Sequence, residues 1–285
     1  MARVAVVTGA NKGIGYAIVK GLAEKFDGLV YLTARNESLG KAALEQVRKE
    51  VGPPGAERIK FHQLDITDQT SIGKLKEHLK KEHDGLDILI NNASIAYKMN
   101  DTAPFAEQAE NTIAVNYFGT KQTCAQLFPL LKPNARVVNV GSRAGSLDKI
   151  SPELKQKILS PSLTVEALDG IMKNFVELAK QNKHKEAGYP STAYAVSKIG
   201  VIALSKIQAA HMKEFNKDTV LLNVMCPGYV KTDMTSHKGH LTPEQGADTV
   251  LYLALLPPGT TQPHGEFVAE RKVIDWAGYA FQPST

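Results

Sequence analysis

The chain has 285 residues, of which 43% are hydrophobic and 22% charged. This composition is typical of a globular protein with one sizeable core, and a continuing alternation of strand and helix patterns favours a single domain. The net charge of +5 arises from interspersed acids and bases rather than from a basic cluster. Such a distribution argues against nucleic-acid binding and is compatible with a mildly basic cleft for an anionic cofactor.

The cysteines and the hydropathy of the chain limit its compartment. Cys124 and Cys226 are far apart and in no metal-ligand or C-x-x-C spacing, so we predict no metal site. The sequence carries no signal-peptide pattern and no apolar run of about 18 residues, so we predict no membrane span. We therefore expect a cytoplasmic protein with no membrane association.

The chain begins with a strand, a glycine-rich turn and a helix. Val4–Val7 is a short apolar run of the kind that is buried in a parallel sheet, and an amphipathic helix is predicted as far as about Lys25. The turn between them, Thr8–Gly15, contains three glycines. Glycines let the backbone approach a pyrophosphate, which the N-terminus of the helix stabilises. A merely structural tight turn is the alternative.

A second strand is predicted over Leu29–Ala34. In dinucleotide-binding folds an acidic residue at the end of this strand holds the ribose 2′-hydroxyl, whereas an arginine accommodates a 2′-phosphate. Here Arg35 follows the strand and Lys12 lies in the glycine turn. Two cations without a carboxylate favour NADPH over NADH, the alternative being that Arg35 simply faces water.

The rest of the chain continues the alternation, which predicts an α/β fold with a doubly wound parallel sheet. We expect helices over Glu37–Val51, Gln69–Glu82, Pro104–Leu131 and Pro243–Leu256, and strands over Ile59–Leu64, from Leu86, over Arg136–Val140 and Val220–Val224, and finally over Gly265–Val268.

Three polar residues in the second half of the chain suit proton transfer. Tyr194 and Lys198 share one face of a helix predicted to run toward Phe215. An ammonium about 4 Å from the phenol oxygen, at an effective dielectric of about 20, would contribute roughly 4 kcal/mol, which brings a phenol pKa from about 10 toward about 7. Ser142 follows a strand end, where a hydroxyl can donate to a substrate carbonyl oxygen. Taken alone, Tyr-x-x-x-Lys occurs by chance and Ser142 would be a turn residue.

These motifs together resemble the short-chain dehydrogenase/reductase family. The spacing of Thr8–Gly15, G-x-x-x-G-x-G, is similar to the family's glycine signature, and Tyr194–Lys198 is similar to its catalytic motif. An unusually long stretch before Tyr194, the Pro227–Met234 motif and the late Tyr252–Pro258 segment resemble the monomeric NADPH-dependent carbonyl reductases of animals over essentially the whole chain. The resemblance implies a Rossmann-type fold and the NADPH-dependent reduction of ketones, aldehydes or quinones.

The resemblance also implies a role for each matching residue. Tyr194 would protonate the carbonyl oxygen, Ser142 would polarise it, and Lys198 would lower the tyrosine pKa and hold the nicotinamide ribose. Asn116 would hold a water in the proton path, and Asp65 would contact the adenine amino group unless it is the N-cap of the following helix. The expected cofactor-binding residues are Gly9, Asn11, Lys12, Gly13, Ile14, Gly15, Arg35, Asp65, Ile66, Asn92, Tyr194, Lys198, Pro227, Gly228, Val230 and Thr232, and the expected substrate-binding residues are Ser142, Tyr194, Cys226 and Tyr229.

The sequence departs from the family pattern at two positions and carries one insertion. Ser94 stands where the family's Asn-Asn-Ala-Gly motif has glycine, and Gly141 stands where members often have serine. The insertion, at about residues 146–189, has helical patterns. In the family it packs over a helix face that other members use to dimerise, so we predict a monomer; the alternative is that it only lines the pocket. We expect a loosely held tail over 277–285.

Two other functions remain open from the sequence. One is a dedicated oxidoreductase for a single lipid or steroid. The other is a non-catalytic NADPH-sensing protein, against which the complete set of Ser142, Tyr194 and Lys198 argues. A reactive Cys226 thiol is also open, although most such cysteines are small buried hydrophobes.

Overall fold

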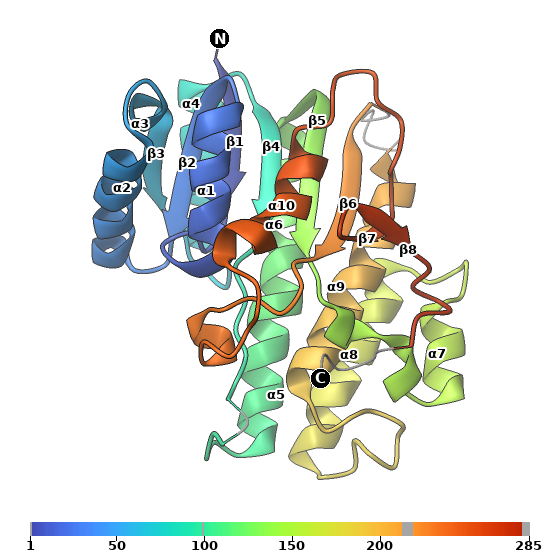
Figure 1. The fold of residues 1–285 in the computed structure, drawn as a ribbon. Helices are drawn as coiled ribbons and strands as arrows, with labels where there is room; N and C mark the ends of the chain where they lie inside the picture. Colours follow the sequence, from blue (N-terminus) through green and yellow to red (C-terminus); the bar gives the residue numbers. More distant parts are fainter. Residues whose placement is uncertain (1, 99, 213–218, 281–285) are drawn as a thin grey trace.

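A mostly parallel sheet with helices on both faces forms the protein. The computed structural model describes residues 2–98, 100–212 and 219–280. Its eight strands lie in the order β3-β2-β1-β4-β5-β6-β7-β8, and every described pair is parallel except β7 and β8 (Figure 1). This order, which reverses between β1 and β4, confirms the predicted doubly wound α/β fold.

The bounds of the elements follow the sequence patterns closely, and two predicted helices, α2 and α4, begin and end at the expected residues. The strands are β1 Arg3–Val7, β2 Gly28–Ala34, β3 Ile59–Gln63, β4 Leu86–Asn91, β5 Leu131–Val140, β6 Leu221–Cys226, β7 Phe267–Ala269 and β8 Lys272–Ile274. The helices are α1 Gly13–Lys25, α2 Glu37–Val51, α3 Gly55–Arg58, α4 Gln69–Glu82, α5 Phe105–Ile113, α6 Thr120–Leu127, α7 Pro152–Ile158, α8 Val165–Lys180, α9 Ala193–Ala210 and α10 Pro243–Ala254.

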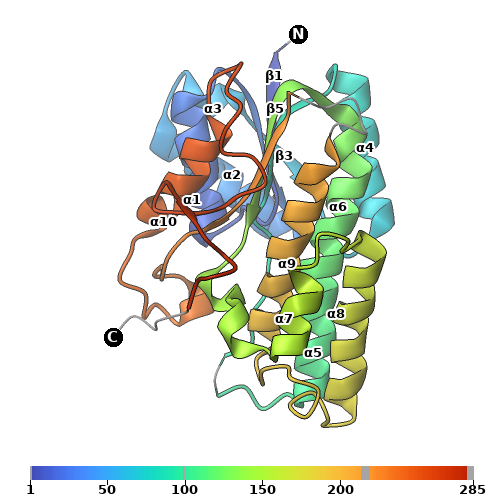
Figure 2. The ribbon, with the colours of Figure 1, turned by 90° about the vertical axis from the view of Figure 1, so that its right-hand side faces the viewer.

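The central strands are apolar on both faces because helices cover both. Val4, Ala5, Val6 and Val7 of β1 are fully buried. Figure 2 shows α1, α2, α3 and α10 on one side of the sheet and α4, α5, α6, α8 and α9 on the other. Each face carries its own apolar layer, one against α1 and α10 and the other against α4, α6 and α9. Because these buried strands run parallel, their carboxyl ends lie at one edge of the sheet, where ligands bind in such folds.

Two sequence predictions of helix bounds are wrong. The helix expected over Pro104–Leu131 is interrupted by a π turn at Ala114–Gly119 and ends in a short 3₁₀ turn. The helix that carries Tyr194 ends at Ala210, short of Phe215, which itself lies outside the described residues.

The strand at the end of the sheet was also missed. A further strand, β8, pairs antiparallel with β7 through a turn at Glu270 and Arg271. Both turn residues have positive φ, 52° and 60°. This matches the two-residue hairpin geometry that usually selects Asn-Gly, so no local sequence signal marked the turn.

The insertion forms part of the main core. It contributes α7 and α8, and α8 lies along α5 and α9 with Leu168, Met172 and Phe175 buried (Figure 2). Asp169 of α8 accepts a hydrogen bond from the hydroxyl of Tyr117 (2.9 Å) and forms an ion pair with Lys121. The predicted helical insertion is therefore confirmed, and it covers a helix face of the main fold. Among the described residues, no helix has both the length and the apolar character needed to cross a bilayer.

Candidate active site

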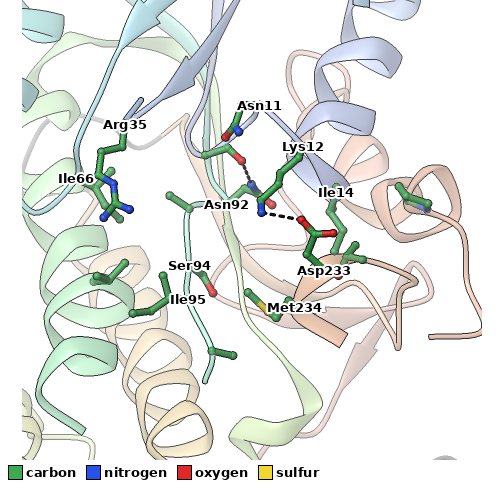
Figure 3. A pocket seen from close by; sticks show the side chains of 18 of the residues that line it. Asn11, Lys12, Ile14, Arg35, Ile66, Asn92, Ser94, Ile95, Asp233 and Met234 are labelled. Atoms are coloured by element: carbon green, nitrogen blue, oxygen red, sulfur yellow. Dashed lines mark hydrogen bonds and ion pairs between the residues drawn. The ribbon is translucent and has the colours of Figure 1, made fainter. Parts of the chain in front are cut away.

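A cavity of about 670 Å³ lies at the carboxyl ends of β1, β2 and β4 (Figure 3). It is enclosed by the glycine turn, by the loops after β2, β3 and β4, and by the segment after β6. Of the predicted cofactor-binding residues, Gly9, Asn11, Lys12, Gly13, Ile14, Gly15, Arg35, Asp65, Ile66, Asn92 and Thr232 line this cavity. Tyr194, Lys198, Pro227, Gly228 and Val230 lie outside its wall.

The glycine turn has the backbone that a phosphate cradle needs. Gly9 and Gly13 have positive φ, 61° and 57°, and a Cβ on Gly9 would lie 2.7 Å from the Cα of Ala93. A Cβ on Gly15 would lie 2.5 Å from Asn92 Nδ2, which donates hydrogen bonds to the carbonyls of Thr8 and Gly9. The first turn of α1 has no side-chain cap, so its N–H groups remain available for an anion. The turn therefore fits a dinucleotide phosphate.

The two predicted phosphate-binding cations are in different situations. Arg35 lines the cavity, and its guanidinium pairs with no described residue. The ammonium of Lys12 instead lies 2.7 Å from Asp233 Oδ2, on the far side of Asn92 from Arg35 (Figure 3). Arg35 is thus free for a 2′-phosphate, whereas Lys12 already has an anionic partner that the sequence analysis did not foresee.

Asp65 lines the cavity and holds the turn before α4. Its Oδ1 accepts from the backbone N–H (2.9 Å) and the hydroxyl (2.6 Å) of Thr67. The N-cap of α4 is Asp68, whose carboxylate accepts from the N–H of Thr70. The alternative that Asp65 caps this helix is therefore wrong.

The three expected catalytic side chains converge beyond the cavity. The side chain of Ser142 is near enough to the phenol of Tyr194 to act on its pKa, which it lowers. The ammonium of Lys198 lies 5.5 Å from the centroid of the Tyr194 ring and donates to the carbonyl of Val140 at 2.7 Å. Residues from the end of β5 and from one turn of α9 thus meet at one point.

Burial has the largest effect on the pKa values of Tyr194 and Lys198. Desolvation raises the pKa of Tyr194 to about 12, and the side chain of Ser142 only partly opposes this. Desolvation also lowers the pKa of Lys198 to about 8. In this arrangement burial is the largest influence on both pKa values, because it disfavours both charged forms, and the lowering of the phenol pKa by Lys198 stays a prediction.

Asn116 occupies the π turn, and its side chain is buried. Its Oδ1 accepts from the N–H of Ile95 (2.8 Å), and its Nδ2 donates to the carbonyl of Ile95 (2.9 Å) and to Ser197 Oγ (3.0 Å). The alternative of an exposed or back-bonded asparagine is wrong. The amide fastens the loop after β4 to α9 between Tyr194 and Lys198, and both of its N–H donors are used.

Comparison with known proteins agrees with this geometry. Residues 3–151 match the family model described as short chain dehydrogenase. Carbonyl reductase (NADPH) 1 of Bos taurus is 51% identical over 96% of this chain and 98% of its own length. The enzyme of the same name from Homo sapiens is 50% identical with the same coverage. The chain belongs to the short-chain dehydrogenase/reductase family.

Solved members of this family share the fold. Salutaridine reductase from Papaver somniferum superposes with a TM-score of 0.83 at 32% identity, covering 93% of this chain and 99% of its own. Menthone neomenthol reductase from Mentha piperita has a TM-score of 0.80 at 30% identity, covering 94% and 99%. The fold similarity thus extends over nearly the whole chain.

The structure accounts for both departures from the family pattern. Ser94 lines the cavity without a positive φ, so its backbone does not require the glycine of other members. A Cβ on Gly141 would lie 2.8 Å from Val224 Cγ2 and 3.2 Å from the carbonyl of Met225. Glycine therefore lets the end of β5 approach β6 closely.

The loop after β6 completes the group around Tyr194. Cys226 Sγ accepts from the N–H of Arg143 (3.2 Å) and of Gly228 (3.4 Å), so it joins this loop to the one that carries Ser142. Burial raises the pKa of the Cys226 thiol, which disfavours the reactive thiolate. Tyr229 is 40% exposed and lies 6.0 Å, ring to ring, from His240.

The sequence analysis did not expect the C-terminal segment to contact the site. The indole of Trp276 is buried and donates to the carbonyl of Gly145 at 2.8 Å, and Ser146 Oγ donates to the carbonyl of Tyr279 at 2.9 Å. Within the predicted loose tail, the carbonyl of Tyr279 is thus held by Ser146, and 281–285 lie outside the described residues. The one sequence signal for this contact was Trp276, the only tryptophan of the chain, because an indole is a large apolar group that usually packs against the protein and finds a hydrogen-bond partner.

Proposed function

We propose that this protein is an NADPH-dependent carbonyl reductase that converts ketones, aldehydes or quinones to alcohols. The observation that carries the proposal is the meeting of Ser142, Tyr194 and Lys198 next to a cavity with a phosphate cradle. Relatives about 50% identical over nearly the whole chain are named for the same activity.

Cofactor binding would rest on the cavity described above. The turn at Gly9 and Gly13 would take the phosphates, Arg35 the 2′-phosphate, and Asp65 and Ile66 the adenine end. When bound, NADPH supplies the hydride for the carbonyl carbon, and the protein supplies alignment and charge. Val230 and Thr232, with Pro227 and Gly228, would border the nicotinamide.

Proton transfer would rest on the chain's own side chains. Tyr194 donates the proton to the carbonyl oxygen, and the Ser142 hydroxyl donates a hydrogen bond to the same oxygen as charge develops. Lys198 in its ammonium form stabilises the phenolate that remains and would contact the nicotinamide ribose. Asn116 keeps Ile95 and Ser197 in place around this group. Cys226 and Tyr229 would line the substrate side.

A dedicated reductase for one substrate is the second candidate. Salutaridine reductase and menthone neomenthol reductase, each named for particular substrates, share this fold at 30–32% identity. A non-catalytic NADPH sensor is less favoured, because the three acid–base side chains converge. We further propose that the protein acts in the cytoplasm. We also propose that it is a monomer, since α8 covers a helix face of α5 and α9 that would otherwise be open.

A spectrophotometric screen tests the function. Purified protein would be mixed with NADPH or NADH and with a quinone, an aromatic aldehyde and a ketosteroid. Oxidation of NADPH by several of these classes would support a broad carbonyl reductase. Turnover of one class alone would favour the dedicated enzyme, and NADPH binding without any turnover would contradict the proposal.

A further inference from the structure

A three-residue charged cluster lies at the edge of the cofactor cavity. Lys12 Nζ lies 2.7 Å from one carboxylate oxygen of Asp233, and His237 Nε2 lies 3.0 Å from the other (Figure 3 labels Lys12 and Asp233). All three residues line the cavity. Lys12 belongs to the glycine turn and Asp233 to the segment after β6, so the ion pair links two sides of the cavity mouth.

The segment that carries Asp233 is shaped independently of this ion pair. Thr235 Oγ1 donates to the carbonyl of Val230 (2.6 Å) and accepts from the N–H of Thr232 (3.1 Å). The N–H of His237 donates to the carbonyl of Thr232 (2.8 Å). Removing the carboxylate of Asp233 therefore loses its contact with His237 but leaves these hydrogen bonds of the segment in place.

The ion pair places a carboxylate where the cofactor's phosphates need a cation. Asp233 contributes no hydrogen bond to the cradle of Gly9 and Asn92, and the ammonium beside it is the main cause of its lowered pKa. A phosphate that approached Lys12 would meet the carboxylate of Asp233 within about one hydrogen-bond length of the ammonium. Like charges at that separation repel even near the surface.

We propose that Asp233 opposes cofactor binding by competing with a dinucleotide phosphate for Lys12, and that it thereby speeds the release of NADP⁺. The inference rests on the proposed use of NADPH, and it names a residue whose role is to limit affinity. Both partners are exposed, with side-chain exposed fractions of 67% and 59%, so the ion pair exchanges readily with a phosphate. Product release limits the turnover of many enzymes, so a residue that speeds the release of NADP⁺ would speed turnover.

Asp233→Asn is the direct test, because it removes the charge and keeps the shape. We expect NADPH and NADP⁺ to bind about three- to tenfold more tightly and NADP⁺ to leave correspondingly more slowly. Fluorescence titration gives the dissociation constants, and stopped-flow displacement gives the release rate. A larger gain for NADPH than for NADH would identify the 2′-phosphate as the competing group, and equal gains would identify the pyrophosphate.

Asp248→Asn is the matched control. Asp248 of α10 also forms an exposed ion pair, with Arg271, and loses the same charge away from the cavity. Its dissociation constants should match the wild type. In a Lys12→Met background, Asp233→Asn should give a much smaller gain, because no ammonium is left to compete for and only the direct repulsion of the phosphate is relieved.

The inference is overturned if Asp233→Asn binds NADPH equally well or more weakly, or if its full effect persists without Lys12. A wild-type protein that binds neither NADPH nor NADH would overturn the proposed function itself. Thermal unfolding of each variant confirms that the folded state is compared.

Discussion

At the scale of single residues, Tyr194 and Lys198 show how burial modifies a motif. Four residues apart on α9, they face each other as helical spacing requires. Their pKa values nevertheless move to about 12 and about 8, because desolvation penalises phenolate and ammonium alike. In the reducing direction a neutral phenol is the useful form, so the high pKa keeps the proton donor loaded.

Tyr194→Phe is expected to reduce turnover by about 10²-fold or more, because it removes only the proton-donating oxygen. Binding of NADPH should persist, since the cradle around Gly9 is untouched. Steady-state kinetics together with a fluorescence titration separates the two effects. Near-normal turnover would refute the assignment of Tyr194 as the acid.

The pKa of Lys198 predicts the pH dependence of the reaction. Below about pH 8 the ammonium is present, and above it the neutral amine prevails, so kcat/KM for reduction should fall as pH rises through about 8. Tyr194, with a pKa of about 12, stays protonated over this range. A profile from about pH 6 to about pH 10, with NADPH affinity measured in parallel, checks this. A flat profile would contradict it.

Arg35 should determine the choice of cofactor, because its guanidinium lines the cavity without a described partner. Arg35→Asp is expected to weaken NADPH binding by about tenfold or more and to leave NADH binding nearly unchanged. Arg35→Lys, which keeps the charge, should retain most of the affinity. Unchanged NADPH affinity in Arg35→Asp would remove the phosphate role.

At the scale of elements, the insertion is held by apolar packing and by one partly buried ion pair. Helix α8 buries Leu168, Met172 and Phe175. Asp169 on the same helix accepts from Tyr117 in the π turn and pairs with Lys121. The same π turn carries Asn116, so the insertion and the catalytic helix meet on one irregular segment.

Asp169→Asn tests that attachment. The variant weakens the hydrogen bond of Tyr117 and leaves Lys121 without its anion, so we expect a loss of about 1–3 kcal/mol in the free energy of unfolding. Urea denaturation measures it. Asp248→Asn, which removes a more exposed pair, should lose less than about 1 kcal/mol, and equal losses would refute the special role of Asp169.

Across the whole molecule, α8 closes the face formed by α5 and α9, and the C-terminal segment covers the loop after Ser142. We expect sedimentation equilibrium to give a mass of 31.0 kDa at micromolar concentration. A mass that rises toward a dimer with concentration would contradict the monomer and would show that another surface associates.

Local residue patterns were enough to predict the α/β alternation, the glycine turn, the shared face of Tyr194 and Lys198, and Ser142 at a strand end. Each of these depends on spacing within a few residues, where helix and strand periodicity are sufficient. The tertiary structure alone decided the Lys12–Asp233 ion pair, the fastening of α9 by Asn116, and the contact of Trp276 with Gly145. These features join residues far apart in the chain, and the pKa directions depend on burial, which no local pattern encodes.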